Sequence, residues 1–150
     1  MPVSAALRRL LRVRELIEED RRRALESALA ELIELENALA SATVREVRGR
    51  QLVRSGVLSG ELADRVAGFE ESRSAVCHQE RLSVRITDAK SRETQTREVY
   101  LSARIERRQA ETLIEEAEAR DSLKGARRGQ RQLDDWHLAR AQNRNERDQG

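Results

Sequence analysis

Cys77 and His78, a thiol beside an imidazole, are the residues whose types could carry catalysis. Cysteine and histidine act together as nucleophile and general base, and both ligate zinc. In a helix, however, adjacent side chains point about 100° apart, and the other histidine, His137, lies about sixty residues away. This spacing gives no nucleophile–base pair and no converging ligands. We therefore expect no catalytic residue, no metal site and no bound cofactor.

Other enzyme signatures are equally weak. The Gly/Ser cluster Ser55–Gly60 lacks the Lys-Ser/Thr ending of a phosphate-binding loop. Carboxylates are interleaved with arginines at i, i+4 spacing, as in Glu18 with Arg22 and Glu93 with Arg97, which is typical of solvated helix surfaces. The sequence therefore predicts that the chain is not an enzyme.

The elements that carry these residues are two long helices. No proline follows Pro2, charged residues make up 37% of the chain and aromatic residues only 2%, so a thick apolar core is excluded. Apolar residues recur in steps of three and four on both sides of the Ser55–Gly60 cluster. We predict an all-α fold, a two-helix antiparallel coiled-coil hairpin whose longer second helix overhangs the first.

The first helix is expected over about residues 4–55, with Ser4 as its N-cap. Its seam is predicted from six apolar positions in heptad spacing, namely Leu25, Ala28, Leu32, Leu35, Leu39 and Ala42. The tip is predicted at about 56–59, because Gly56 suits the left-handed position after a helix and Ser59 suits the next N-cap.

The second helix is expected over about residues 60–140, with a break near the glycines at 125–129 and a disordered polar tail at 142–150, all within a single domain, 1–150. Its predicted seam has a first run, Leu62, Val66, Phe69, Arg73 and Val76, and a second run, Leu82, Ile86, Ala89, Glu93, Thr96, Tyr100, Ala103, Arg107, Ala110, Ile114 and Ala117.

Reflecting the chain about residue 57 or 58 tests whether the two seams meet. Leu39 then falls opposite Val76, and the first helix ends opposite residue 111. Everything beyond Thr112 overhangs, including Leu123, Leu133 and Trp136, for which the hairpin offers no partner. We expect this overhang either to pack on another protein or to fray.

Charge bears on the class of partner. The net charge is only +2, but both chain ends are basic. Nucleic-acid binding is disfavoured, because acids flank the Arg21–Arg23 run and no aromatic is interleaved to stack on bases. No apolar run approaches the roughly 20 residues that span a bilayer, and the start does not read as a signal peptide. We expect a cytoplasmic protein without direct membrane insertion.

Three segments resemble the FliJ family of flagellar type III export proteins. They are the opening at residues 7–20, the tip Ser55–Gly60 followed by a helix carrying Phe69, and the ending Gln130-Arg-Gln-Leu-Asp-Asp-Trp136 with Arg140 behind it. The resemblance covers nearly the whole chain, and the C-terminal segment is its specific motif.

The resemblance implies a stalk-like coiled coil that couples the hexameric type III export ATPase to the cytosolic domain of the membrane export gate and escorts export chaperones, at the cytoplasmic face of the flagellar basal body. It implies two sets of contact residues. Those expected at the ATPase are Arg8, Arg9, Arg12, Arg14, Arg131, Leu133, Asp134, Asp135 and Trp136, and those expected at the gate are Phe69 and Val76.

Three alternatives remain open at this stage. The chain could be the equivalent stalk of a virulence injectisome, or a generic structural coiled coil that dimerises through its seam. For Phe69 and Val76, the competing interpretation is packing within the seam.

Overall fold

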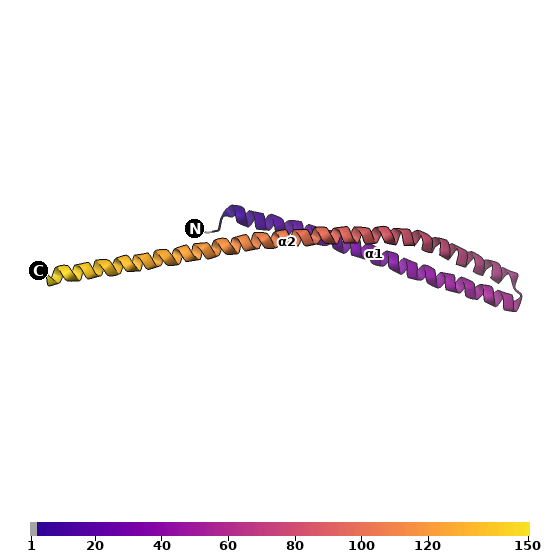
Figure 1. Cartoon of the computed structure of the whole chain (residues 1–150). Helices are drawn as coiled ribbons and strands as arrows, with labels where there is room; N and C mark the ends of the chain where they lie inside the picture. Colours follow the sequence, from indigo (N-terminus) through magenta and orange to yellow (C-terminus); the bar gives the residue numbers. More distant parts are fainter. Residues whose placement is uncertain (1–2) are drawn as a thin grey trace. The chain divides into compact units, whose positions relative to one another are not determined.

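The computed structural model describes residues 3–150, which form two α-helices, α1 (Ala5–Ser59) and α2 (Leu62–Asp148), and no strand (Figure 1). α1 has 55 residues and α2 has 87. The two helices pack against each other in antiparallel directions, so the prediction of an all-α hairpin with a longer second helix is confirmed.

The described residues divide into two compact units. One unit is Glu18–Ala103, which includes the turn, and the other combines residues 3–17 with Arg104–Gly150. Between Ala89 and Ala103 the seam positions of α2 are the polar or partly polar side chains of Glu93, Thr96 and Tyr100, and all three are only half-buried. Continuous apolar packing in the Glu18–Ala103 unit therefore ends at Ala89.

The start of α1 is capped as predicted. The Ser4 hydroxyl accepts a hydrogen bond from the Ala6 amide at 3.2 Å, and the Ser4 carbonyl accepts the first helical bond, from Arg8. A serine in this position satisfies one of the amides that a helix N-terminus leaves unpaired. The predicted N-cap at Ser4 is confirmed.

The turn lies further along the chain than predicted. α1 continues through Gly56 to Ser59, and Gly60 takes the left-handed conformation, with φ of +76°. The Glu61 carbonyl accepts the first bond of α2 from the Arg65 amide, so Glu61 and not Ser59 precedes α2 as its N-cap. The predicted cap at Gly56 is wrong, because this glycine serves a contact between the helices.

The core of the Glu18–Ala103 unit is a small apolar cluster. Leu35 and Ala42 of α1 pack with Leu82, Ile86 and Ala89 of α2. These are predicted seam positions, and the second run of the α2 seam stays buried or half-buried from Leu82 to Ala117. The heptad interpretation of both stretches is therefore confirmed.

Nearer the turn, glycines bring the two backbones together. A Cβ placed on Gly49 would lie 2.6 Å from the Ser72 nitrogen and 2.7 Å from the Gly68 oxygen. A Cβ on Gly68 would lie 2.5 Å from the Gly49 oxygen and 2.8 Å from the Val53 nitrogen. No side chain fits between the helices here, so the seam of α2 runs through Gly68, Ser72 and Ala75.

This glycine seam overturns the first run predicted for α2. Leu62, Val66 and Phe69 are exposed, at 67%, 55% and 60%. Arg73 is exposed as well, and only Val76 is half-buried. The prediction fails because it assigns the seam by side-chain size, whereas the backbones approach too closely for large residues to lie between them.

The register shifts with the turn. Gly49 lies against Ser72, Gly56 against Arg65, and Arg45 forms an ion pair with Glu71 at 2.9 Å. The two glycine contacts centre the reflection between Gly60 and Glu61, about three residues later than predicted, while the long side chains of Arg45 and Glu71 reach each other along the helix axes. Leu39 accordingly packs beside the Leu82 cluster and not opposite Val76.

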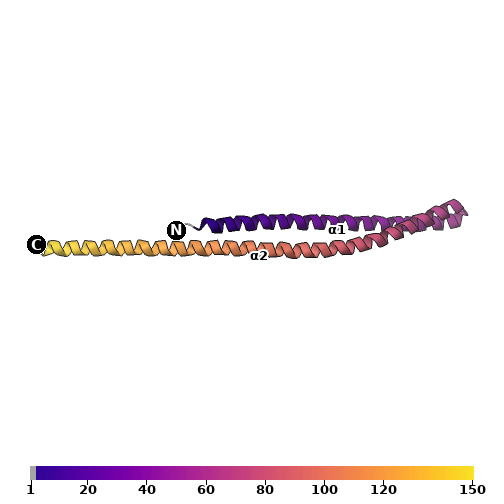
Figure 2. The ribbon, with the colours of Figure 1, turned by 90° about the horizontal axis from the view of Figure 1, so that it is seen from above.

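In the other unit, the start of α1 lies beside α2 and the remainder of α2 continues alone (Figures 1 and 2). Arg14 and Glu106 join the two segments at 2.6 Å. Beyond Asp121 every residue is exposed except Gly129, which is half-buried, and we call residues 122–148 the overhang.

The overhang is more regular than predicted. α2 passes through Gly125 and Gly129 without a break, and residues 142–148 are helical where a disordered tail is predicted. Each glycine costs a helix only about 1 kcal/mol relative to alanine, and strong helix formers such as Lys124, Ala126 and Arg128 flank both. Two isolated glycines are thus insufficient to interrupt a long helix.

The glycine contact predicts opposite effects for two similar substitutions. Gly49→Ala should lower the free energy of unfolding, because the strain of inserting a methyl group, about 1–3 kcal/mol, exceeds the gain in helix propensity of about 1 kcal/mol. Gly125→Ala, whose Cβ meets no atom within 4 Å, should raise it. Denaturant unfolding followed by circular dichroism measures both, and equal stabilisation by the two variants would contradict the backbone contact.

Candidate functional site

The groups that could do chemistry remain apart in the structure. Cys77 is exposed and His78 half-buried, and residues 3–150 contain no group of three His, Cys, Asp or Glu side chains placed to hold a metal ion. Neither described helix has a stretch apolar and long enough to cross a membrane. The candidate sites are therefore surfaces.

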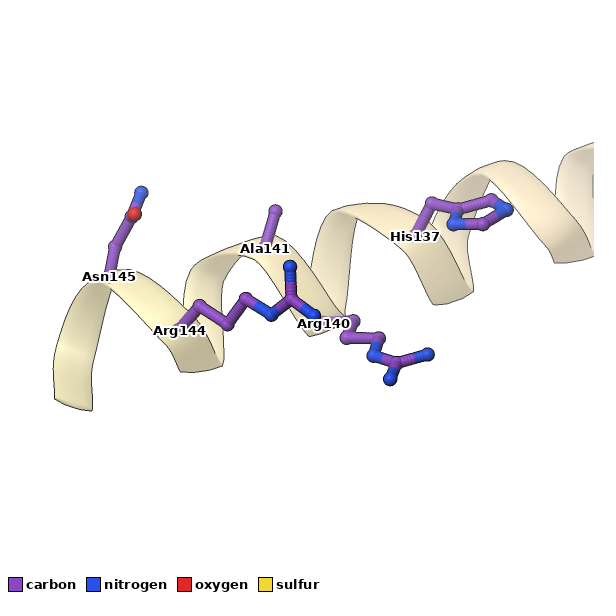
Figure 3. Close-up of a pocket in the computed structure, with 5 residues that line it drawn as sticks. All are labelled: His137, Arg140, Ala141, Arg144 and Asn145. Carbon is purple, nitrogen blue, oxygen red and sulfur yellow. The ribbon is translucent and has the colours of Figure 1, made fainter. Parts of the chain in front are cut away.

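Hollows on the molecule confirm this description, since each is lined by consecutive turns of one helix. Figure 3 shows one of them, where His137, Arg140, Ala141, Arg144 and Asn145 project from a single stretch of α2. Another is lined by Ile105 and Leu113 with the polar residues between them. Such depressions are open on their outer side, so they can contact a partner but cannot enclose a small substrate.

The overhang carries an aromatic group held by its neighbours. The Arg140 guanidinium carbon lies 5.1 Å from the centre of the Trp136 ring, a cation–π arrangement, and the His137 ring meets the indole edge-on at 5.1 Å and 70°. Leu133 lies one turn earlier on the same side. Both Leu133 and Trp136 remain about half exposed, and we call Leu133, Trp136 and Arg140 the overhang patch.

The charged candidates of this segment surround the patch. The Asp134 carboxylate accepts a hydrogen bond from the side-chain amide (Nε2) of Gln130 at 3.0 Å. Arg131 and Asp135 are exposed. The charges of Arg131 and Asp135 are therefore open to a partner.

The basic opening of α1 belongs to the same unit. Arg8, Arg9 and Arg12 are exposed beside Leu11 and Glu15, whereas Arg14 is half-buried and paired with Glu106. Trp136 lies about thirty residues beyond Glu106 on the same helix, roughly 45 Å at 1.5 Å per residue. The structure therefore places the two parts of the predicted ATPase contact on one unit but does not bring them together.

The turn exposes a second apolar surface. Five large apolar side chains around it are more than half exposed, and Leu58 reaches 89%. We call them the tip patch: Val57, Leu58, Leu62, Val66 and Phe69. Contiguous exposed apolar side chains of this kind mark interaction sites.

Phe69 and Val76, the predicted gate contacts, share one face of α2 because they are two turns apart. Gln79, one turn after Val76, donates hydrogen bonds to Glu46 at 2.9 Å and to Thr43 at 3.5 Å on α1. The face therefore flanks the contact with α1. Phe69 projects from it into solvent, which excludes the competing interpretation of seam packing for Phe69, while Val76 is partly covered.

Charged side chains near the turn interact with one another and with the glycine contact. A hydrogen bond with the Asp64 carboxyl, and its negative charge, raise the pKa of Glu61. The Arg65 stem packs over Gly56, and its Nε is buried without a hydrogen-bond partner. In the body of α1, by contrast, a hydrogen bond from Arg22 and its charge lower the pKa of Glu19.

The sequence interpretation missed two features of these surfaces. It assigned Leu62 and Val66 to the seam, and it did not identify Gly49 and Gly68 as contact residues. A signal was present, because Ala42, Gly49 and Gly56 recur every seven residues on α1 and Gly68, Ala75, Leu82 and Ala89 do so on α2.

Comparison with known proteins gives one result of high coverage. The model of the family described as "Flagellar FliJ protein" matches residues 4–146 of the chain. No curated protein and no solved structure matches. The family match favours the flagellar apparatus over an injectisome, and the family is a non-catalytic component of protein export. The chain belongs to the FliJ family of flagellar type III export proteins.

Proposed function

We propose that this chain acts as the stalk of the flagellar export apparatus, coupling the hexameric type III export ATPase to the membrane export gate and escorting export chaperones. The observation that carries the proposal is the overhang, a single helical segment whose described residues are almost all exposed and which presents Trp136 half exposed. The proposal locates the chain in the cytoplasm, at the cytoplasmic face of the basal body.

The chemistry of the overhang supports binding within a protein ring. Tryptophan and arginine are the side chains that most often dominate the binding energy of an interface, and here they form one preorganised unit. Arg131, Asp134 and Asp135 supply charges of both signs around it. The exposed Arg8, Arg9 and Arg12 would add contacts at a second level of the ring, with Arg14 holding α1 against α2 through Glu106.

The tip patch supports a second, separate partner. It is apolar, and it lies in the Glu18–Ala103 unit and not in the unit that contains the overhang. We assign the cytosolic domain of the export gate to this surface, with Phe69 as the main contact and Val76 at its edge. The chaperone-escort role rests on the family relationship, and we assign it no surface.

Trp136→Ala should weaken binding to the purified hexameric export ATPase by about tenfold or more, which is the effect of losing a residue that dominates an interface. Stimulation of ATP hydrolysis should fall in parallel. Because Trp136 is half exposed and its ring contacts are with Arg140 and His137 of the same helix, the helicity and melting temperature of the variant should be unchanged. The two measurements are the affinity of the variant for the ATPase and the rate of ATP hydrolysis as the variant is titrated into the enzyme.

The matched control is Leu138→Ala, an exposed apolar residue two positions further on that points to the other side of the helix. It should leave affinity and stimulation within about twofold, since contacts outside the central residues of an interface contribute little. Full stimulation by Trp136→Ala, or by a chain truncated after Ala126, would overturn the stalk proposal.

Phe69→Ala should reduce affinity for the cytosolic domain of the export gate by about tenfold or more, because an exposed aromatic ring can bury a large apolar area on binding. ATPase stimulation by this variant should be unchanged. Val84→Ala, which removes an equally exposed apolar group further along α2, is the control. Equal effects of the two substitutions on gate binding would contradict a contact centred on Phe69.

A generic structural coiled coil would behave differently in isolation. The polar seam positions Glu93, Thr96 and Arg107 favour a hairpin of modest stability over a tight dimer. We expect a monomer by light scattering at micromolar concentration. A stable stoichiometric dimer would instead support the structural alternative.

A further inference from the structure

Near the turn, α2 offers two sets of positions that could form its seam. One set is Gly68, Ser72 and Ala75, and the other is Val66, Phe69, Arg73 and Val76, and the members of each set follow one another at the spacing of three or four that helix packing requires. The second set would bury far more apolar surface. The structure nevertheless packs the first set against α1 and exposes Val66 and Phe69.

The first set forms the seam because the backbones of the two helices are in contact there. The Cβ that Gly68 lacks would lie 2.5 Å from the Gly49 oxygen, and the one that Gly49 lacks would lie 2.6 Å from the Ser72 nitrogen. Atoms of the two backbones are therefore in van der Waals contact over this turn, and such contacts offset the missing side-chain burial. Any side chain at position 68 or 49 removes this arrangement.

The next turn shows the same rotation of α2. A Cβ on Gly56 would lie 2.9 Å from both the Arg65 nitrogen and its Cγ. Arg65 thus takes the inward position, with its Nε buried and unpaired, while the neighbouring Val66 points outward. Burying part of a cation in place of a valine is unfavourable by itself, so the rotation is imposed by the glycine contacts and not by local preference.

We propose that Gly49 and Gly68 are positioning residues, whose contact sets the rotation of α2 about its axis so that Phe69 and Val66 face an apolar partner surface. This proposal rests on the proposed docking of the tip patch at the export gate. A rotation by one position, about 100°, would move Phe69 from solvent into the place of Gly68. The glycines therefore control whether the contact surface exists.

A reporter at position 69 tests the rotation directly. In a Trp136→Phe background, Phe69→Trp places the one indole of the chain on the tip patch, where acrylamide should quench it efficiently. Adding Gly68→Leu blocks the backbone contact, so α2 should rotate and bury the indole. We expect the emission to shift to shorter wavelength and the quenching constant to fall roughly twofold or more, because the indole would move from solvent into the seam.

Gly68→Leu in the otherwise native chain should also abolish binding to the cytosolic gate domain while ATPase stimulation persists. Should this variant fail to fold, Gly68→Ala with the same reporter tests the same contact with a smaller insertion. The control is Leu82→Ala, which destabilises the apolar cluster but leaves the glycines in place. It should change neither the quenching nor, below its melting temperature, the affinity for the gate.

Unchanged quenching in folded Gly68→Leu and Gly68→Ala would overturn the proposal, because the rotation would then not depend on the glycine. Loss of gate binding without a change in quenching would overturn it as well. The proposed gate contact fails separately, if Phe69→Ala binds the gate normally. In that case a change in the emission and quenching of the indole at position 69 would still establish that the glycines set the rotation of α2. It would refute the claim that this rotation serves binding to the gate.

Discussion

Small residues at every seventh position let α1 and α2 approach until their backbones touch, and the structure near the turn depends on this approach. Helices that interdigitate large side chains keep their axes about 8–10 Å apart, whereas Gly49 and Gly68 leave no room for even one methyl group. The contact fixes the register around Gly60. Around Gly49 and Gly68 the packing is therefore between backbone atoms and not between large side chains.

The parts of the fold that could be predicted from the sequence are those governed by side-chain size. Leu35 and Ala42 of α1 and the run from Leu82 to Ala117 follow heptad spacing, and they lie in the seam. Prediction failed where glycine does the packing. Glycine often ends a helix, so local preference predicts that α1 stops at Gly56. In the structure Gly56 is buried inside α1 with Arg65 against it. This tertiary contact cannot be inferred from local preference.

The candidate surfaces were predictable to different degrees for the same reason. The overhang follows from the difference in length between the two arms, so Leu133 and Trp136 could be identified as exposed groups without knowing any packing detail. The stacking of Arg140 on Trp136 could not, because i, i+4 spacing allows this contact without requiring it. The exposure of Phe69 could not be predicted, because it depends on the rotation of α2 about its axis. The periodicity of large apolar residues predicts the wrong rotation, with Phe69 in the seam.

A chain of this design can carry two functions with little interference. Substitutions at distant, independent sites have nearly additive effects, and the tip patch and the overhang patch lie in separate compact units. Both nevertheless belong to α2, which runs unbroken from Leu62 to Asp148. The absence of a break at Gly125 and Gly129 matters here, because a flexible joint would let the overhang reorient freely. One continuous helix therefore carries both patches, each with its own chemistry and each within its own compact unit.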